Sequence, residues 1–138
     1  MRVLLPLTSI ILLAGCMTAS VSAQPSAAAA ERHAKDEVKL AKALEGKIAG
    51  EPVSCINLRN VRSTKSYGDA TMLYVVSSRL VYRNDPPGGC PMRDDRTIIT
   101  RTPTNMLCRG DIAQIKDLTS GFGFGGCSLG EFVPYRPG

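Results

Sequence analysis

A β-hairpin is predicted by the run Thr71-Met72-Leu73-Tyr74-Val75-Val76-Ser77-Ser78-Arg79-Leu80-Val81-Tyr82-Arg83. Its first half, residues 71–76, is nearly all apolar, which indicates a central strand of a sheet. Ser77-Ser78 forms a two-residue link, and Leu80 and Tyr82 then alternate with other residues on one side of a second strand. The link lacks the glycine that two-residue turns prefer, but the pattern on both sides of it is that of a strand.

Four further segments have the pattern of short strands, namely residues 55–62, 96–102, 112–118 and 127–133. In the first of them Val61 is out of step with Ile56 and Leu58, which indicates a bulge or the end of the strand. Residues 121–126 predict a glycine-rich loop before the last strand. Six short strands after one helix favour a mainly β fold, α+β at most, with a small antiparallel barrel or sandwich over residues 50–138.

Residues 31–49 predict one amphipathic helix ahead of the strands. Apolar residues recur near helical spacing at Ala34, Val38, Ala41 and Ile48. Lysines gather on the other side, and Gly50-Glu51-Pro52 ends the pattern. We expect the apolar stripe to pack on the β domain. A helix lying on a membrane surface is the alternative, which the acidic residues among the lysines weaken.

The start of the chain, residues 1–15, has the features of an export signal. A basic residue, Arg2, precedes an apolar run of 11 residues, Val3–Leu13. A membrane span needs about 20 such residues, so the run matches a signal peptide instead. The run leads into Leu13-Ala14-Gly15-Cys16, which resembles the lipobox of bacterial lipoproteins, where the cysteine is lipidated and becomes the new N-terminus.

We therefore expect cleavage before Cys16 and a membrane anchor on its thiol. The alternative is cleavage after Val21-Ser22-Ala23, which would release a soluble periplasmic protein. Residues 16–30 are rich in Ala and Ser and carry no charged side chain, so they predict a flexible tether. Met17 in place of Asp favours the outer membrane, with the protein facing the periplasm. Both cleavage sites export the chain.

Four cysteines remain in the mature chain: Cys55, Cys90, Cys108 and Cys127. An even number in an exported protein predicts two disulfides, for which three connectivities are possible. Cys90–Cys108 inside Cys55–Cys127 is the pairing we favour, because it places a local loop within a long one. There is no Cys-x-x-Cys pair, so neither a metal site nor another cofactor is expected.

Charge and composition exclude some classes of function. The net charge of +5 is mild, and together with export it argues against nucleic acid as a partner. The one histidine, His33, lies in the predicted helix, so catalysis by a Ser-His or Cys-His pair in the β domain is not expected. Asp111 and Asp117 provide two carboxylates, but nothing in the pattern shows that they act together.

Several blocks of the mature chain form an ordered series: Cys55-Ile56-Asn57-Leu58-Arg59-Asn60-Val61-Arg62, Tyr82-Arg83-Asn84, Cys90-Pro91, Leu107-Cys108-Arg109-Gly110-Asp111-Ile112 and Cys127-Ser128-Leu129-Gly130-Glu131-Phe132. The series resembles a proteobacterial family of small exported proteins, domain-of-unknown-function family 6491, over about residues 50–135. That family often continues Cys-Pro-Gly-Leu, whereas this chain has Cys90-Pro91-Met92-Arg93. The resemblance implies an exported, disulfide-bonded domain and carries no catalytic residue.

Two groups of residues are candidates for binding. Arginines alternate with apolar residues in several predicted strands, which could gather them on one sheet face that holds phosphate or carboxylate groups: Arg59, Arg62, Arg79, Arg83, Arg96 and Arg101. An ordinary polar outer face is the alternative. Phe122 and Phe124 in the glycine-rich loop could form an apolar contact for a partner or a lipid, the alternative being a simple hairpin tip.

These observations predict a non-enzymatic cell-envelope lipoprotein that serves as a binding or structural module. Its expected partners are the membrane, through the anchor, and an anionic envelope polymer or an envelope protein. An inhibitor of an exported enzyme is the alternative. A secreted periplasmic protein without an anchor is the third possibility.

Overall fold

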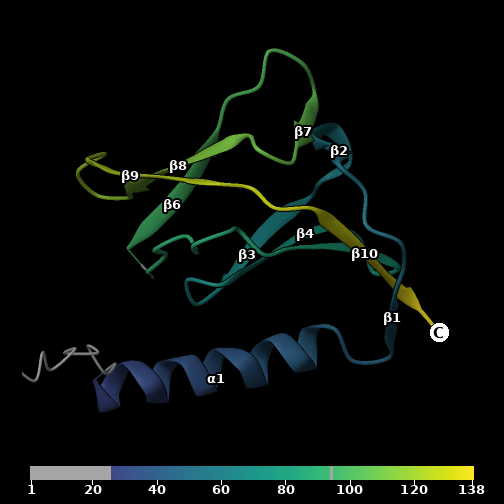
Figure 1. Ribbon diagram of the computed structural model, residues 1–138, viewed down its shortest axis with the longest axis horizontal. Helices are drawn as coiled ribbons and strands as arrows, with labels where there is room; N and C mark the ends of the chain where they lie inside the picture. Colours follow the sequence, from purple (N-terminus) through teal and green to yellow (C-terminus); the bar gives the residue numbers. More distant parts are fainter. Residues whose placement is uncertain (1–25, 94) are drawn as a thin grey trace, which may run out of the picture.

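The structure, a computed structural model, describes residues 26–93 and 95–138. The predicted signal peptide and Cys16 lie outside the described residues. The described chain is mainly β, with one α-helix, one short 3₁₀-helix and three antiparallel sheets (Figure 1). The predicted fold class is therefore confirmed, although the described residues form ten strands where six were expected.

Helix α1 (Ala27–Ala43) starts inside the segment predicted to be a tether. Ser26 caps it, since its Oγ accepts a hydrogen bond from the backbone N–H of Ala29 at 3.3 Å, and a run of alanines with high helix propensity follows. The helix also ends earlier than residue 49. Gly46 has a φ of +69°, which turns the chain so that the next residues become a strand.

The largest sheet has the order β1-β10-β5-β4-β3. Its strands are β1 (Lys47–Ala49), β10 (Phe132–Pro137), β5 (Leu80–Asn84), β4 (Thr71–Ser77) and β3 (Ser63–Tyr67). Lys47–Ala49, predicted as the end of the helix, pairs with β10 at the edge of this sheet. The β domain therefore begins before residue 50.

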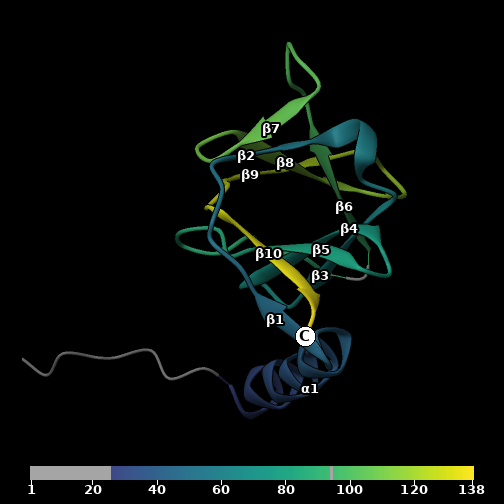
Figure 2. The same cartoon turned by 90° about the vertical axis from the view of Figure 1, so that its right-hand side faces the viewer.

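The predicted hairpin is confirmed as β4 and β5, and β4 is covered on both faces. Leu73 packs with Leu40 of α1 and with Val81, whereas Met72 and Tyr74 belong to the main core. Side chains of a strand alternate between faces, so a strand that is apolar throughout needs cover on both of them. Figure 2 shows these layers, with α1 on one side of the sheet and the smaller sheets on the other.

Two smaller sheets complete the described domain: β2-β7 and β6-β8-β9. Their strands are β2 (Cys55–Asn57), β7 (Met106–Cys108), β6 (Arg96–Thr100), β8 (Ile112–Asp117) and β9 (Gly123–Ser128). The predicted strand 55–62 stops at Asn57, whose side chain caps the 3₁₀-helix Leu58–Asn60. The predicted strand 127–133 is in fact the end of β9 and the start of β10.

The glycine-rich segment predicted as a loop is instead mostly β9, which pairs with β8. Gly126 is required there, because a Cβ would lie 2.9 Å from the carbonyl oxygen of Ala113 in β8. Glycine thus allows the two backbones to approach closely, although the composition of the segment is that of a loop.

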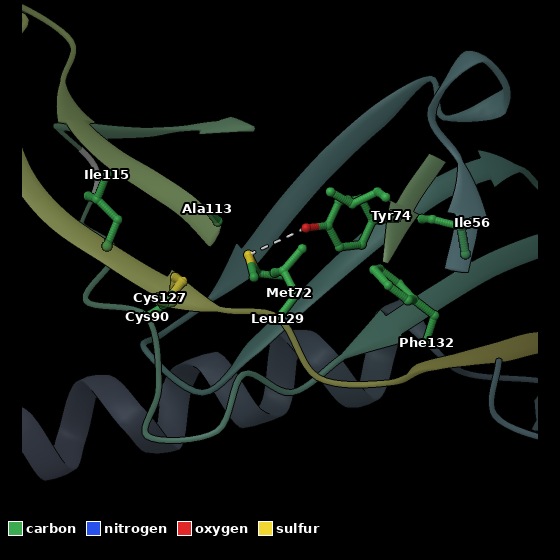
Figure 3. Packing of buried hydrophobic residues seen from close by; sticks show 10 residues of the cluster. Ile56, Met72, Tyr74, Cys90, Ala113, Ile115, Cys127, Leu129 and Phe132 are labelled. Carbon is green, nitrogen blue, oxygen red and sulfur yellow. Dashed lines mark hydrogen bonds between the residues drawn. A yellow bond between two sulfur atoms is a disulfide. The ribbon is translucent and has the colours of Figure 1, made fainter. Parts of the chain in front are cut away.

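The main core lies between the five-stranded sheet and the smaller sheets. Figure 3 shows Tyr74 and Phe132 facing each other within it, and their rings pack edge to face with centroids 5.5 Å apart. Burial raises the pKa of Tyr74 to about 12, so its phenol stays neutral. Ile56 and Leu107, from paired positions in β2 and β7, close the core on the side away from α1.

The described cysteines form two disulfides, as predicted, but in a different pairing. Cys55 is bonded to Cys108 and Cys90 to Cys127, whereas the nested pairing was expected. Cys55 and Cys108 are direct partners in the β2-β7 register, with their Cα atoms 4.0 Å apart. The pairing follows from strand register, which the spacing of cysteines along the chain does not reveal. No helix in the described residues has the length and apolar character needed to cross a membrane.

Candidate functional site: a basic cleft beside helix α1

A cleft of about 360 Å³ lies where α1, β3, the segment after Cys90 and β6 meet. Helix α1 contributes Asp36 and Lys39, and Tyr67 ends β3. Arg93 and Arg96 line it from the β5–β6 connection and from the first position of β6. The cleft therefore combines three cations with one carboxylate among the described residues that line it.

The β5–β6 connection is held in place at its centre, which positions Arg93. The backbone N–H of Cys90 donates to the carbonyl oxygen of Asp69 at 2.6 Å, and the Cys90–Cys127 disulfide fastens the same residue to β9. Gly89 has a φ of +79°, and a Cβ there would lie 2.9 Å from the Asp69 carbonyl oxygen. Only glycine fits this approach without displacing the backbone.

Arg96 is the best-positioned cation of the cleft. Its Nη1 donates to the carbonyl oxygen of Pro91 at 2.9 Å, and its Cζ lies 4.0 Å from the ring centroid of Phe124. Its Nε is buried and has no hydrogen-bond acceptor among the described residues. A guanidinium has five N–H donors, and the structure gives one hydrogen bond to the described residues, from Nη1, so the remaining terminal N–H groups are the ones that could meet a ligand oxygen in the cleft.

The electrostatics of the cleft favour an anion. The Nζ of Lys39 lies 3.2 Å from Oδ1 of Asp36, so this lysine offsets the charge of the one acidic residue among the described lining residues. Partial burial raises the pKa of Tyr67, and the charge of Lys39 opposes that rise without cancelling it. Tyr67 is therefore a neutral hydrogen-bond donor at neutral pH, and the described lining residues carry two cations, Arg93 and Arg96, beyond the Asp36–Lys39 pair.

The six predicted arginines do not form one sheet face. Only Arg83 and Arg96 lie within strands, and these strands belong to different sheets. The other four lie on the 3₁₀-helix or in connections: Arg59, Arg62, Arg79 and Arg101. The predicted face required all six arginines to lie in strands of one sheet, because alternation along a strand is what would place their side chains on the same side.

Arg83 is occupied by an intramolecular contact. Its Nε donates to both carboxylate oxygens of Asp85, at 3.0 and 2.9 Å. Burial lowers the pKa of Arg83, but the hydrogen bonds and charge of Asp85 outweigh it and hold the pKa above its ordinary value. Of the six predicted arginines, only Arg96 lines the cleft.

Phe122 and Phe124 lie on the β8–β9 hairpin, and their ring centroids are 6.3 Å apart. Phe122 is 70% exposed in the connection and Phe124 is 44% exposed in β9. Their exposure agrees with the contact hypothesis, and Phe124 also stacks on Arg96.

Asp111 and Asp117, the two carboxylates noted in the sequence, lie at either end of β8. Asp111 directly precedes β8 and accepts a hydrogen bond from the backbone N–H of Cys108, whereas Asp117 ends β8 and accepts from the backbone N–H groups of Thr119 and Ser120. Backbone and side-chain hydrogen bonds from Ser120 and Thr119 lower the pKa of Asp117, with a further contribution from Arg96. Within residues 26–93 and 95–138, no three His, Cys, Asp or Glu side chains lie close enough to hold a metal ion.

Sequence reasoning missed Lys39, Arg93 and Tyr67 as partners of Arg96. Lys39 belongs to the polar side of the predicted helix, and Arg93 follows Cys90-Pro91 in a loop. No local pattern joins them, because the cleft forms only when α1 packs on the sheet. Searches of family models, curated proteins and solved structures found no match to this chain, so the family resemblance stays a prediction.

Proposed function

We propose that this chain is a non-enzymatic cell-envelope lipoprotein whose β domain binds a phosphate or carboxylate group of an envelope component in the basic cleft. The anchor is a lipid on Cys16, and the protein faces the periplasm from the outer membrane. The described domain has two disulfides and no membrane-spanning helix, which is compatible with export.

The observation that carries the proposal is the position of Arg96. Its guanidinium lines the cleft and is held by the carbonyl oxygen of Pro91 and by the ring of Phe124. A cation that is already held in place loses little side-chain freedom on binding, and guanidinium donors match the paired oxygens of phosphate and carboxylate. The neighbouring Arg93 adds a second positive charge.

The test is calorimetric titration of the mature, lipidated protein in detergent micelles, with pyrophosphate and an oligogalacturonate as probes. Arg93→Gln should weaken binding about 10- to 150-fold, because a hydrogen bond to a charged group contributes about 1.5–3 kcal/mol. Arg79→Gln is the matched control, since Arg79 is exposed and outside the cleft. Equal losses in the two variants, or none in Arg93→Gln, would contradict the proposal. The probe that binds more tightly identifies the chemical class of the ligand.

The anchor has its own test. Cys16→Ser should move the protein from the membrane fraction to the soluble fraction of a cell extract. A variant that still sediments with membranes would contradict the lipoprotein part of the proposal, whatever the result for the cleft.

A further inference from the structure

The tip of the β8–β9 hairpin exposes three large apolar side chains. Leu118 is 63% exposed, Phe122 70% and Phe124 44%. The tip is held by hydrogen bonds, because Oδ1 of Asp117 accepts from the backbone N–H groups of Thr119 and Ser120 at 2.9 and 2.6 Å. These apolar side chains are therefore held in contact with water, which is unfavourable in free energy. Contact with another apolar surface would bury them and remove that cost.

The tip and the start of α1 lie at the same end of the molecule. In Figure 1 the β8–β9 connection and the first turn of α1 both point to the left, while β1 and the C-terminus lie at the opposite end. Ser26 precedes α1 and lies ten residues after Cys16. Fully extended, ten residues span at most about 35 Å, so a lipid on Cys16 would keep this end close to the bilayer.

Cations accompany the apolar tip. Arg96 stacks on the ring of Phe124, and Lys116 precedes Asp117 in β8. Arg32 and Lys35 are exposed in the first half of α1, at the same end, and the Nζ of Lys35 also lies 2.8 Å from Oε1 of Glu31. Aromatic side chains beside Lys and Arg are typical of the membrane–water interface, where rings enter the headgroup region and cations meet lipid phosphates.

We infer that the β8–β9 tip inserts into the surface of the bilayer that carries the lipid anchor, with Phe122 and Leu118 as the inserting side chains. The inference rests on the lipid anchor of the proposed function. A bilayer is a better occupant than a protein, because a stable protein interface buries about 800 Å² on each partner. Three side chains provide much less, whereas they suffice as an interfacial contact for a domain that is already anchored.

The chain contains no tryptophan, so a single introduced indole can report the environment of the tip. The Phe122→Trp variant of the mature, lipidated protein is reconstituted in vesicles of phosphatidylethanolamine and phosphatidylglycerol. Its emission should shift to shorter wavelength, and lipids with brominated chains should quench it. Ile48→Trp is the matched control: Ile48 is 66% exposed in β1 at the opposite end, so the emission of that variant should not change with vesicles.

Flotation of the vesicles separates the two hypotheses. If the Phe122→Trp protein floats and its indole remains as open to acrylamide as in vesicle-free detergent solution, the anchor stands and the insertion is refuted. The tip is then better explained as a protein contact, as in an inhibitor of an exported enzyme. If the protein does not float, both the anchor and the insertion are refuted. Equal quenching of the Phe122→Trp and Ile48→Trp variants by brominated lipids would also refute insertion through the tip.

Discussion

Asn84 should be one of the most sensitive positions of this protein. It is fully buried at the end of β5, where its Nδ2 donates to the carbonyl oxygens of Gly130 and Glu131 at 2.8 and 3.2 Å. Its Oδ1 accepts from the backbone N–H of Gly130 at 3.0 Å. One side chain thus satisfies the buried backbone of the β9–β10 connection, 46 residues further along the chain.

The magnitude follows from what Asn84→Ala leaves behind. The variant loses these hydrogen bonds and leaves the N–H and the carbonyl of Gly130 without partners in a buried position. Each unsatisfied buried group costs about 1–3 kcal/mol, so we expect a loss of about 4 kcal/mol in the free energy of unfolding. Small domains have about 5–15 kcal/mol in total, so the variant should be close to unfolding at about 37 °C.

Urea denaturation followed by circular dichroism, under oxidising conditions, measures this loss. Asn60→Ala is the control: Asn60 is exposed at the end of the 3₁₀-helix, and its change should stay within about 0.5 kcal/mol. A loss below about 1 kcal/mol for Asn84→Ala, or one equal to the control, would refute the reasoning.

Asn84→Asp adds a test by pH. A protonated carboxyl keeps one donor and one acceptor, whereas the charged form would be buried opposite the carbonyl oxygens. The folded-state pKa of the new group should therefore lie above its unfolded value of about 3.9. Its stabilising contribution is present below that value and is lost as the pH rises through the folded-state pKa. A variant equally stable at about pH 4 and about pH 7 would contradict this role.

Three other predictions concern the loops and the disulfides. The double variant Cys90→Ala, Cys127→Ala should lose about 2–4 kcal/mol of unfolding free energy, because the bond joins residues 37 positions apart; denaturation measures this loss. The same variant should bind the cleft ligand more weakly in titration, because the bond holds the segment beside Arg93. Gly130→Ala should cost more than about 2 kcal/mol by thermal melting, since its Cβ would lie 2.5 Å from the carbonyl oxygen of Asp85. Turn hydrogen bonds lower the pKa of Asp117 in the folded state. The stabilising contribution of Asp117 is therefore present above the ordinary pKa of 3.8 and is lost as the pH falls through the folded-state pKa. Asp117→Asn should accordingly reduce the loss of stability that is measured between about pH 5 and about pH 2.

The strand errors have a common physical cause. β3 (Ser63–Tyr67) and β7 (Met106–Cys108) were not predicted, because one is largely polar at the edge of its sheet and the other has three residues. The glycines of β9 favour a loop by composition, yet the close approach of β8 is what requires Gly126. In each case pairing with a neighbour supplies the stability that local propensity lacks.

The sequence by itself determined the elements whose signal is local. Residues 71–83 carry the alternation and the apolar run of a hairpin. The four cysteines after Cys16 are even in number, which predicts that they pair completely. Hydrophobic periodicity acts over a few residues, so it can be read without the fold.

Only the tertiary structure decided which distant residues meet. Cys55 and Cys108 are 53 residues apart, and the register of β2 with β7 joins them. Lys39, Arg93 and Arg96 form a cleft because Leu40 and Leu73 dock α1 onto the sheet, which brings three separate segments together. Such contacts are non-local: packing of the whole domain stabilises them, and no short stretch of sequence encodes them.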